Sequence, residues 1–444
     1  MVVRDCSVVN RDGLPPRFAH ATRLTTFSNN FVLFAVATEN RCDSEIDAMP
    51  KFPLSSSNAN SLRPSVFSTL TAQFKLLPAP PIPLQLGDTY REPCAAAHID
   101  RAVLRLPKTK AYAYSNPWGL EELRVAFAKR LENDGLKGIH ADNVQVTAGG
   151  SQAINVVLQT WLQPGDEVLV AAPYWPLIKG MITSVGAIPV EVPFYPGIRQ
   201  GVPVADLLQP YLTDRTVALY VCTPNNPCGT VLSATQVSEL AVFAVKNDLW
   251  TIADEAYHHY IYDDTPHPWL ANEPGMATRT ASIFTTSKSY ALAGLRTGFL
   301  VGDTSWLDVS RRVSTHQIYS VPVICQYAAL GAIEEGAPWI AETKASYKRI
   351  AKIVRDTLQA DFGNADGGGY VFPDFTKELN GKPMITWIQE LLREGVCISP
   401  GDAFGKDFEN FSRICFTSVP EDQVVLAIER LNKSLDRLRA GRPL

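Results

Sequence analysis

The residues best suited to covalent chemistry lie between positions 281 and 302, in the stretch ASIFTTSKSYALAGLRTGFLVG. An apolar, β-prone run ends there in hydroxyl residues and a single lysine, Lys288, and Arg296 follows after a turn. A lysine at the exit of a buried strand can form an imine with an aldehyde if burial keeps part of its amine neutral. Thr285, Ser287 and Arg296 offer two hydroxyls and a guanidinium, which suit a phosphate dianion. The stretch therefore predicts a site for an aldehyde that carries a phosphate.

The ordinary explanation of this stretch involves no chemistry. A lysine on a loop is most often exposed to solvent, and Arg296 would then take part in a surface ion pair. The choice between the two interpretations depends on whether other parts of the chain offer groups that fit the same ligand.

Other predicted strand ends do carry such groups. Gly150 and Ser151 open a predicted helix, where backbone N–H groups can hold a phosphate. Asp254 follows the apolar run LWTIA, so we expect a buried carboxylate that needs a cationic partner such as a pyridinium N–H. Trp175, between two prolines, can lie flat against an aromatic ring, and Asn226 can donate to a phenolate oxygen. A glycine connector, a packed loop tryptophan and an ordinary turn explain three of these motifs equally well when each is taken alone.

Arg413 lies inside the otherwise apolar run FSRICFT, near the C-terminus. A buried guanidinium is costly without a partner, so we expect it to meet a carboxylate, either from the protein or from a ligand. An internal ion pair and a substrate-binding arginine are both consistent with this position.

These candidates can form one site only if the fold brings them together, and the spacing of apolar runs predicts such a fold. Strand-like runs begin near residues 144, 167, 188, 217, 249, 281 and 297, and helical segments such as 119–131 and 234–246 alternate with some of them. The alternation is typical of an α/β fold with a mostly parallel, seven-stranded sheet sandwiched by helices. Ligands bind such sheets at the carboxyl ends of the strands, and the candidate groups of this sheet fall just after such strand ends.

Other segments predict the domain organisation. We expect a large domain at 94–335, and a smaller α+β domain at 336–444 that also takes up part of an N-terminal arm, 62–93. Residues 1–61 are predicted to be a disordered extension, because the run SSSNANS at 55–61 is a polar, low-complexity spacer. Met49, just before this spacer, is a candidate start of translation.

Composition excludes several classes of partner. The 444 residues are 46% apolar and 19% charged, with a net charge of -4, so no basic excess points to nucleic acid. No apolar run approaches the roughly 20 residues that a membrane helix needs, and we expect a soluble chain. The eight cysteines are scattered, with no Cys-x-x-Cys pair and no zinc spacing, which predicts reduced core thiols in the cytoplasm and no metal.

In combination and in order, these motifs resemble those of the class I and II aminotransferases of fold type I, which bind pyridoxal 5'-phosphate (PLP). The resemblance covers roughly residues 62 to 440. It implies that Lys288 forms the imine with PLP, that Asp254 pairs with the pyridine nitrogen and that Trp175 stacks on the ring. Asn226 and Tyr257 correspond to the donors to the phenolic oxygen. The implied phosphate ligands are Gly150, Ser151, Thr285, Ser287 and Arg296.

The same resemblance implies a substrate, a partner and a reaction. Arg413 corresponds to the arginine that grips the substrate α-carboxylate, with Asn226 and Trp175 beside it. Tyr114 corresponds to the tyrosine that reaches the phosphate of the neighbouring subunit, which implies a homodimer with shared active sites. The implied reaction is a ping-pong transfer of the amino group of an L-amino acid to a 2-oxo acid, with the freed Lys288 as general acid and base.

Two alternatives remain open at this point. A PLP-dependent lyase, racemase, decarboxylase or oxidase on the same fold differs only in the fate of the same carbanion, and fold alone does not fix function. A regulator that binds the cofactor without catalysis belongs to another class. It is disfavoured by the complete set of candidate catalytic residues and by the lack of a DNA-binding module in the first 60 residues.

Overall fold

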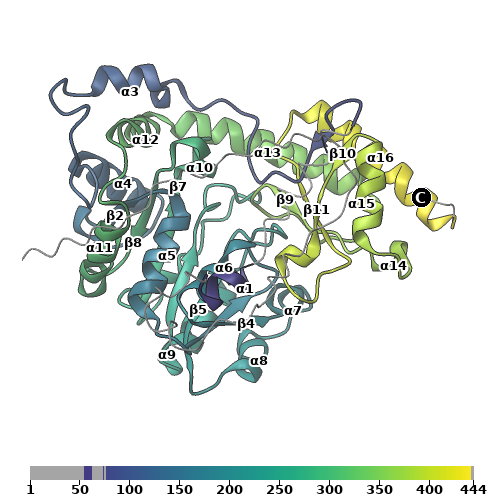
Figure 1. The fold of residues 1–444 in the computed structure, drawn as a ribbon, viewed down its shortest axis with the longest axis horizontal. Coiled ribbons are helices and arrows are strands. Elements are labelled where there is room, and N and C mark those ends of the chain that lie inside the picture. The colour runs from purple at the N-terminus through teal and green to yellow at the C-terminus, as the bar shows by residue number, and fades with distance from the viewer. Residues whose placement is uncertain (1–54, 63–73, 75–76, 442–444) are drawn as a thin grey trace, which may run out of the picture. The chain divides into compact units, whose positions relative to one another are not determined.

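The central element is a seven-stranded mixed sheet, seen in a computed structural model that describes residues 55–62, 74 and 77–441 (Figure 1). Only β8 runs antiparallel to its neighbours, which are β2 and β7, and the other adjacent pairs are parallel. All seven predicted strands are present, and the prediction of a mostly parallel seven-stranded sheet is confirmed. In spatial order the strands are β2 (Val144–Thr147), β8 (Gly298–Val301), β7 (Thr280–Thr285), β6 (Trp250–Asp254), β5 (Thr216–Cys222), β3 (Glu167–Ala171) and β4 (Ile188–Val192).

Both faces of this sheet are covered by helices, which explains why its strands are apolar without alternation. Along β3, Val168 and Val170 pack in one apolar cluster with α5 (Gly149–Trp161), whereas Leu169 and Ala171 pack in another with α9 (Ala234–Lys246). Successive side chains of a strand point to opposite faces, so a strand covered on both sides buries every residue. On the first face α11 (Thr304–Ile318) also packs on α5, and α6 (Leu177–Ser184) lies beside it.

Local sequence explains where several helices begin and which side they bury. The helix α9 has the bounds predicted for it, and its start is fixed by a reciprocal capping box between Ser233 and Gln236. The helix α4 (Glu121–Asn133) buries Leu123, Phe127 and Leu131, which recur at the helical spacing of four residues. It packs with α12 (Val323–Glu335) on the part of the sheet formed by β2 and β8.

A second group of elements involves the C-terminal part of the chain, drawn in yellow-green to yellow in Figure 1. Its antiparallel sheet has the order β11 (Ser399–Pro400), β12 (Ser412–Cys415), β9 (Tyr370–Val371), and β1 (Ile82–Pro83) pairs in parallel with β10 (Val396–Cys397). Leu84 shares an apolar core with the helices of this region. These helices are α13 (Ala337–Thr357), α15 (Met384–Arg393) and α16 (Glu421–Arg439).

The domain boundaries proposed from sequence stay a prediction, and the pairing of β1 with β10 supports the part that joins the N-terminal arm to the C-terminal domain. Of the predicted N-terminal extension, residues 1–54 lie outside the described residues. Within 55–61, which we expected to belong to a disordered extension, Ser56 caps the short helix α1 (Ser57–Ser61), which buries none of its residues.

The other α-helices of the described residues are short, and they are α3 (Ile99–Arg105), α7 (Phe194–Arg199), α8 (Val204–Leu208), α10 (Thr286–Ser289) and α14 (Thr376–Leu379). In the part of the chain that the structure describes, no helix is both long and apolar enough to pass through a bilayer.

Candidate active site

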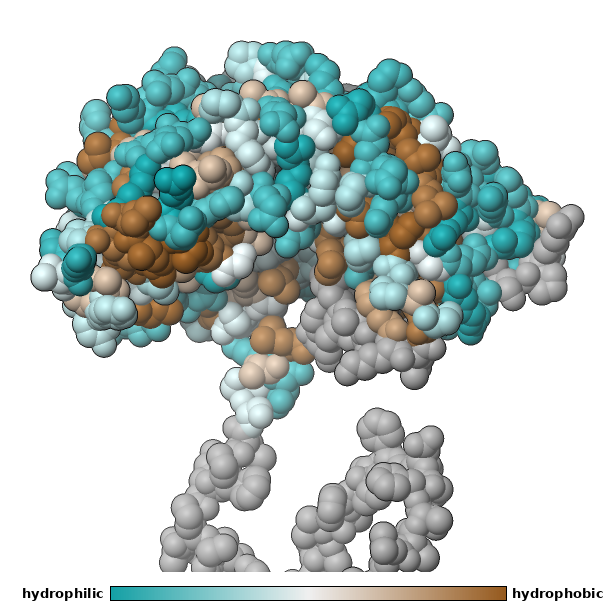
Figure 2. Space-filling view, turned by 90° about the horizontal axis from the view of Figure 1, so that it is seen from above, coloured by the Kyte–Doolittle hydropathy of each residue, from teal (hydrophilic) through white to brown (hydrophobic). Residues whose placement is uncertain are grey.

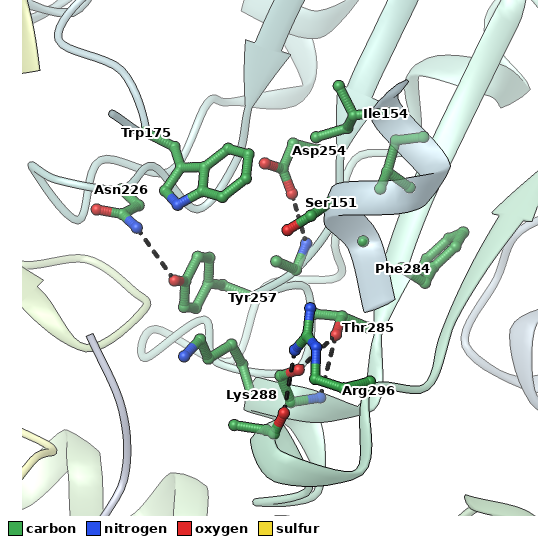
Figure 3. Close-up of a pocket in the computed structure, with 15 residues that line it drawn as sticks. Ser151, Ile154, Trp175, Asn226, Asp254, Tyr257, Phe284, Thr285, Lys288 and Arg296 are labelled. Carbon is green, nitrogen blue, oxygen red and sulfur yellow. Dashed lines mark hydrogen bonds between the residues drawn. The ribbon is translucent and has the colours of Figure 1, made fainter. Parts of the chain in front are cut away.

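A pocket of about 210 Å³ opens at the carboxyl ends of β5, β6 and β7. Figure 3 shows Trp175, Asn226, Tyr257 and Lys288 on one side of it and Ser151, Thr285 and Arg296 on the other. Ten of the twelve residues that sequence proposed for the site line this pocket, and they are Gly150, Ser151, Trp175, Asn226, Asp254, Tyr257, Thr285, Ser287, Lys288 and Arg296. The structure thus brings together groups from six separate segments of the chain.

Lys288 lies in α10, directly after strand β7. Thr285 ends the strand and caps this short helix, because its hydroxyl accepts a 3.1 Å hydrogen bond from the Ser287 N–H. The Lys288 amine donates to the carbonyl oxygen of Gly87, and a carboxylate oxygen of Asp88 lies 4.0 Å away. Burial lowers the pKa of the Lys288 amine from its usual value, and Asp88 partly opposes this effect. A larger share of the amine is therefore neutral, as a nucleophile requires.

A cradle of hydrogen-bond donors lies at the start of α5, and it consists of Gly150, Ser151, Thr285, Ser287 and Arg296. A Cβ atom on Gly298 would lie 2.5 Å from the carbonyl carbon of Gly149, so only glycine lets β8 approach the start of the helix this closely. A Cβ atom on Gly149 would lie 2.5 Å from Nη2 of Arg296, so the guanidinium also packs against this turn. Backbone N–H groups at a helix start, two hydroxyls and one guanidinium together fit a phosphate.

Asp254 ends β6, and only 8% of the residue is exposed. Its Oδ2 accepts a 2.7 Å hydrogen bond from the Tyr220 hydroxyl, and its Oδ1 accepts a 3.3 Å hydrogen bond from the Ala256 N–H. Burial raises the pKa of this carboxyl to about 6, and the two hydrogen bonds work in the opposite direction. Both donors are neutral, so a ligand with a positively charged N–H group would stabilise the ionised carboxylate.

Asn226 and Tyr257 lie together on the opposite side of the pocket from Arg296. Nδ2 of Asn226 donates to the Tyr257 hydroxyl at 3.3 Å, as the dashed line in Figure 3 marks. Trp175 is partly buried at the edge of the same pocket. The three side chains offer a flat aromatic surface and two hydrogen-bond donors to one ligand.

Arg413 is buried in β12, next to the pocket. Its Nη1 donates to Oδ1 of Asn226 at 3.0 Å, and its Nη2 donates to the carbonyl oxygen of Gln85 at 2.8 Å. The guanidinium lies over the rings of Tyr370 and Phe404, with its carbon 4.7 and 5.0 Å from their centroids. These contacts fix a cation beside Asn226, and the expectation that Arg413 meets a carboxylate of the protein or of a ligand stays a prediction.

Tyr114 does not line the pocket of its own chain. The residue is 85% exposed, and its ring contacts that of Tyr319 at a centroid distance of 5.0 Å. This exposure leaves Tyr114 able to reach another chain.

Sequence reasoning missed Tyr220, Tyr370 and Gly87, which contact the predicted site residues. A signal existed for Tyr220, because Cys222 pairs with Asp254 across β5 and β6 and Tyr220 points to the same face as Cys222. No local pattern singles out Gly87 or Tyr370, since both contact residues far away in the chain.

A second cluster of titratable groups lies outside the pocket. Asp134, His258 and His259 bring possible metal-ligand atoms within 4.8 Å of one another. The guanidinium of Arg130 already contacts two of them, since its Nε donates to Asp134 at 2.7 Å and its Nη2 lies 3.0 Å from Nε2 of His259. A cation of the protein therefore occupies the place beside the Asp134 carboxylate.

The sheet topology and the pocket at its carboxyl edge are typical of α/β proteins that bind a small ligand there. The model of one family, described as aminotransferase class I and II, matches residues 87–431. The chain belongs to the class I and II aminotransferases, and it is an aminotransferase of fold type I.

Relatives and solved structures agree with this membership. An aspartate aminotransferase of Pyrococcus abyssi is 34% identical over 333 residues, which cover 72% of this chain and 81% of that protein. The aromatic-amino-acid aminotransferase 2 of Thermococcus litoralis is 32% identical over 338 residues, which cover 73% and 82%. The structure of a double mutant of Thermus thermophilus aspartate aminotransferase superposes with a TM-score of 0.79 at 26% identity, covering 86% of this chain and all (100%) of that one.

Proposed function

We propose that this aminotransferase uses PLP to move the amino group of an L-amino acid to a 2-oxo acid. The observation that carries the proposal is that Lys288, Asp254 and Arg296 line one pocket of a size suited to a small cofactor. An amine, an acid and a guanidinium in this arrangement match the aldehyde, the pyridine nitrogen and the phosphate of PLP.

The residues of the pocket fit this group chemically. We assign the phosphate to the cradle of Gly150, Ser151, Thr285, Ser287 and Arg296, whose donors lie together at the start of α5. Asp254 would hold the pyridine nitrogen, Trp175 would lie against the ring, and Asn226 with Tyr257 would donate to the phenolic oxygen. When bound, PLP supplies an aldehyde that links to an amine and a protonated ring that takes up electrons as the α-proton leaves.

The side chains of the protein perform the remaining tasks. Lys288 would take the α-proton of the substrate and return it at the carbon that was the aldehyde of the cofactor, which requires an amine with a lowered pKa. Asp254, once paired with a cation, stays ionised and keeps the ring nitrogen protonated. Arg413, held by Asn226 and the Gln85 carbonyl, orients the substrate through its carboxylate.

We also propose a homodimer in which Tyr114 completes the phosphate site of the partner subunit. Its exposure supports this role, as do the apolar residues Ile99, Val103 and Leu104 of α3, which are 45%, 54% and 77% exposed. Figure 2 views the molecule from the side on which α3 and α12 lie, and it shows apolar surface between hydrophilic areas. Exposed apolar surface of this kind is typical of a protein interface.

We further propose a cytoplasmic location, which the six described cysteines support because none of them forms a disulfide. They are Cys94, Cys222, Cys228, Cys325, Cys397 and Cys415.

The proposed function is tested by reconstitution with PLP, borohydride reduction and peptide mapping. We expect a visible absorption band and a covalent label on Lys288, and Lys288→Ala should lose both. Amino-group exchange is then measured with aspartate, aromatic and other amino acids against several 2-oxo acids. A label on another lysine, or release of ammonia or carbon dioxide without exchange, would contradict the proposal.

A further inference from the structure

Tyr370 belongs to a closed ring of four side chains beside the pocket. Nη1 of Arg413 donates to Asn226 at 3.0 Å, and Nδ2 of Asn226 donates to the Tyr257 hydroxyl at 3.3 Å. The hydroxyls of Tyr257 and Tyr370 are 2.8 Å apart, and the Arg413 guanidinium lies over the Tyr370 ring at 4.7 Å. The ring thus connects the proposed substrate clamp to the proposed donors of the cofactor oxygen.

Both phenols keep their protons at neutral pH. Tyr370 and Tyr257 are only 2% and 6% exposed, and burial raises the pKa of each phenol above its usual value. Two protonated hydroxyls at 2.8 Å share one hydrogen bond, so one of them donates and the other accepts.

The surroundings favour Tyr370 as the donor of this bond. The positive charge of Arg413 lies over its ring and makes the Tyr370 hydroxyl a stronger acid. The Tyr257 oxygen has two acceptor sites, of which Asn226 fills one and Tyr370 would fill the other. The proton of Tyr257 then has no acceptor within the ring of four and is directed into the pocket that Tyr257 lines.

We propose that Tyr370 is a positioning residue, which donates its proton to Tyr257 and thereby turns the Tyr257 proton towards the phenolic oxygen of bound PLP. The inference rests on the proposed function, and it adds a residue that no motif indicated. Because Tyr370 acts only through Tyr257, we expect its effect first in the pKa of the bound cofactor and only as a consequence in the reaction rate.

The test is a pH titration of the visible absorption band in the holoenzyme. A donor to the phenolic oxygen takes up part of its negative charge, and this oxygen would then hold less tightly a proton shared with the Lys288 nitrogen, so a strong Tyr257 donor should lower the pKa of the band. In Tyr370→Phe the Tyr257 oxygen loses a donor and Tyr257 becomes a weaker acid. We expect the pKa of the band to rise by roughly 0.5 to 1, the effect of one neutral hydrogen bond.

The matched control is Tyr262→Phe, which also removes one buried phenol hydroxyl. That hydroxyl donates to the Gly368 carbonyl rather than to Tyr257, so the pKa of the band should not move. A second variant replaces Tyr370 by 3-fluorotyrosine, whose hydroxyl is more acidic, and it should lower the pKa of the band. The two replacements at position 370 therefore predict shifts of opposite sign, and the fluorinated residue keeps the hydroxyl if the phenylalanine variant does not fold.

A lower or unchanged pKa in Tyr370→Phe, or a raised or unchanged one with 3-fluorotyrosine, would overturn the inference, and a shift opposite to the expected one would show that Tyr257 donates to Tyr370. These results are distinct from failure of the proposed function. In that case the wild-type protein would show no visible band and no label on Lys288.

Discussion

The hydroxyl of Tyr220 donates a 2.7 Å hydrogen bond to Oδ2 of Asp254, and both residues are buried. A neutral donor stabilises the carboxylate less than a cation would, so burial still raises the pKa of Asp254 to about 6. Two predictions depend on this pair.

The stability of the cofactor-free protein should decrease as pH rises from about 4, the usual pKa of an aspartate, to about 6, the pKa of Asp254 in the folded protein. The folded state keeps the Asp254 proton in this range while the unfolded state loses it, at a cost of roughly 3 kcal/mol when the transition is complete. Urea unfolding over this pH range would measure the effect. Asp254→Asn should lack this contribution, and equal pH dependence in both proteins would contradict the assignment.

Tyr220→Phe should weaken cofactor binding near neutral pH. The variant removes a donor to the ionised carboxylate and raises the pKa of Asp254 further, and a hydrogen bond to a charged group is worth about 1.5–3 kcal/mol. We expect a loss of affinity on the order of tenfold, smaller at higher pH, measured by equilibrium dialysis of the cofactor. The control is Tyr195→Phe, because that buried hydroxyl donates to the Cys222 carbonyl and not to Asp254.

Gly298→Ala should weaken binding of the phosphate in particular. The new Cβ would lie 2.5 Å from the Gly149 carbonyl carbon and would push the start of α5 away from β8, an overpacking that costs about 1–3 kcal/mol. Affinity for PLP should therefore fall more than affinity for pyridoxal, which lacks the phosphate. Gly294→Ala serves as control, because nothing lies within 4 Å of a Cβ atom there. Equal losses for the two ligands would argue against a phosphate site in this cradle.

Arg413→Lys should reduce the affinity for amino acids while the cofactor stays bound. Lysine keeps the charge but not the planar fork that binds a carboxylate, and disrupting a buried charged pair costs about 2–5 kcal/mol. The amino-acid concentration that half-converts the visible band should rise on the order of 100-fold by that figure. Arg279→Lys is the control, because Arg279 pairs with the exposed Asp248. An unchanged midpoint in Arg413→Lys would remove Arg413 from the substrate site.

Hybrid dimers test the role proposed for Tyr114. If Tyr114 serves the partner subunit, a dimer of one Lys288→Ala chain and one Tyr114→Ala chain contains one site with both residues intact. When the two variants are dissociated and then mixed, that site should bind the cofactor with normal affinity. At most half of all sites in the hybrid dimers can recover in this way. No recovery on mixing would show that Tyr114 acts within its own chain or not at all.

Sequence predicted the sheet well because its signals are local. Each strand is a short apolar run, and α9 has the predicted bounds because Ser233 and Gln236 cap it from neighbouring positions. Asp254 was expected to be buried because it follows an apolar run, and the structure agrees. Such features depend on only a few consecutive residues.

Contacts between distant segments were not predictable in the same way. Arg413 was expected to meet a carboxylate of the protein or of a ligand, which stays a prediction, and sequence did not indicate its hydrogen bonds to Asn226 and the Gln85 carbonyl, which lie far away in the chain. The hydrogen bond from Tyr220 to Asp254 depends on the register of two strands, and that of Tyr370 depends on how β9 meets the large sheet. Side-chain spacing along the chain carries little information about these partners.

The segment just after β1 supplies two of the acceptors described above, the carbonyls of Gln85 for Arg413 and of Gly87 for Lys288. Proteolysis that removes the chain up to and including residue 87 would leave every strand of the large sheet intact. It would still remove the backbone carbonyls that accept hydrogen bonds from Arg413 and Lys288. The shortest active fragment of this protein must therefore retain residues that precede its main catalytic framework.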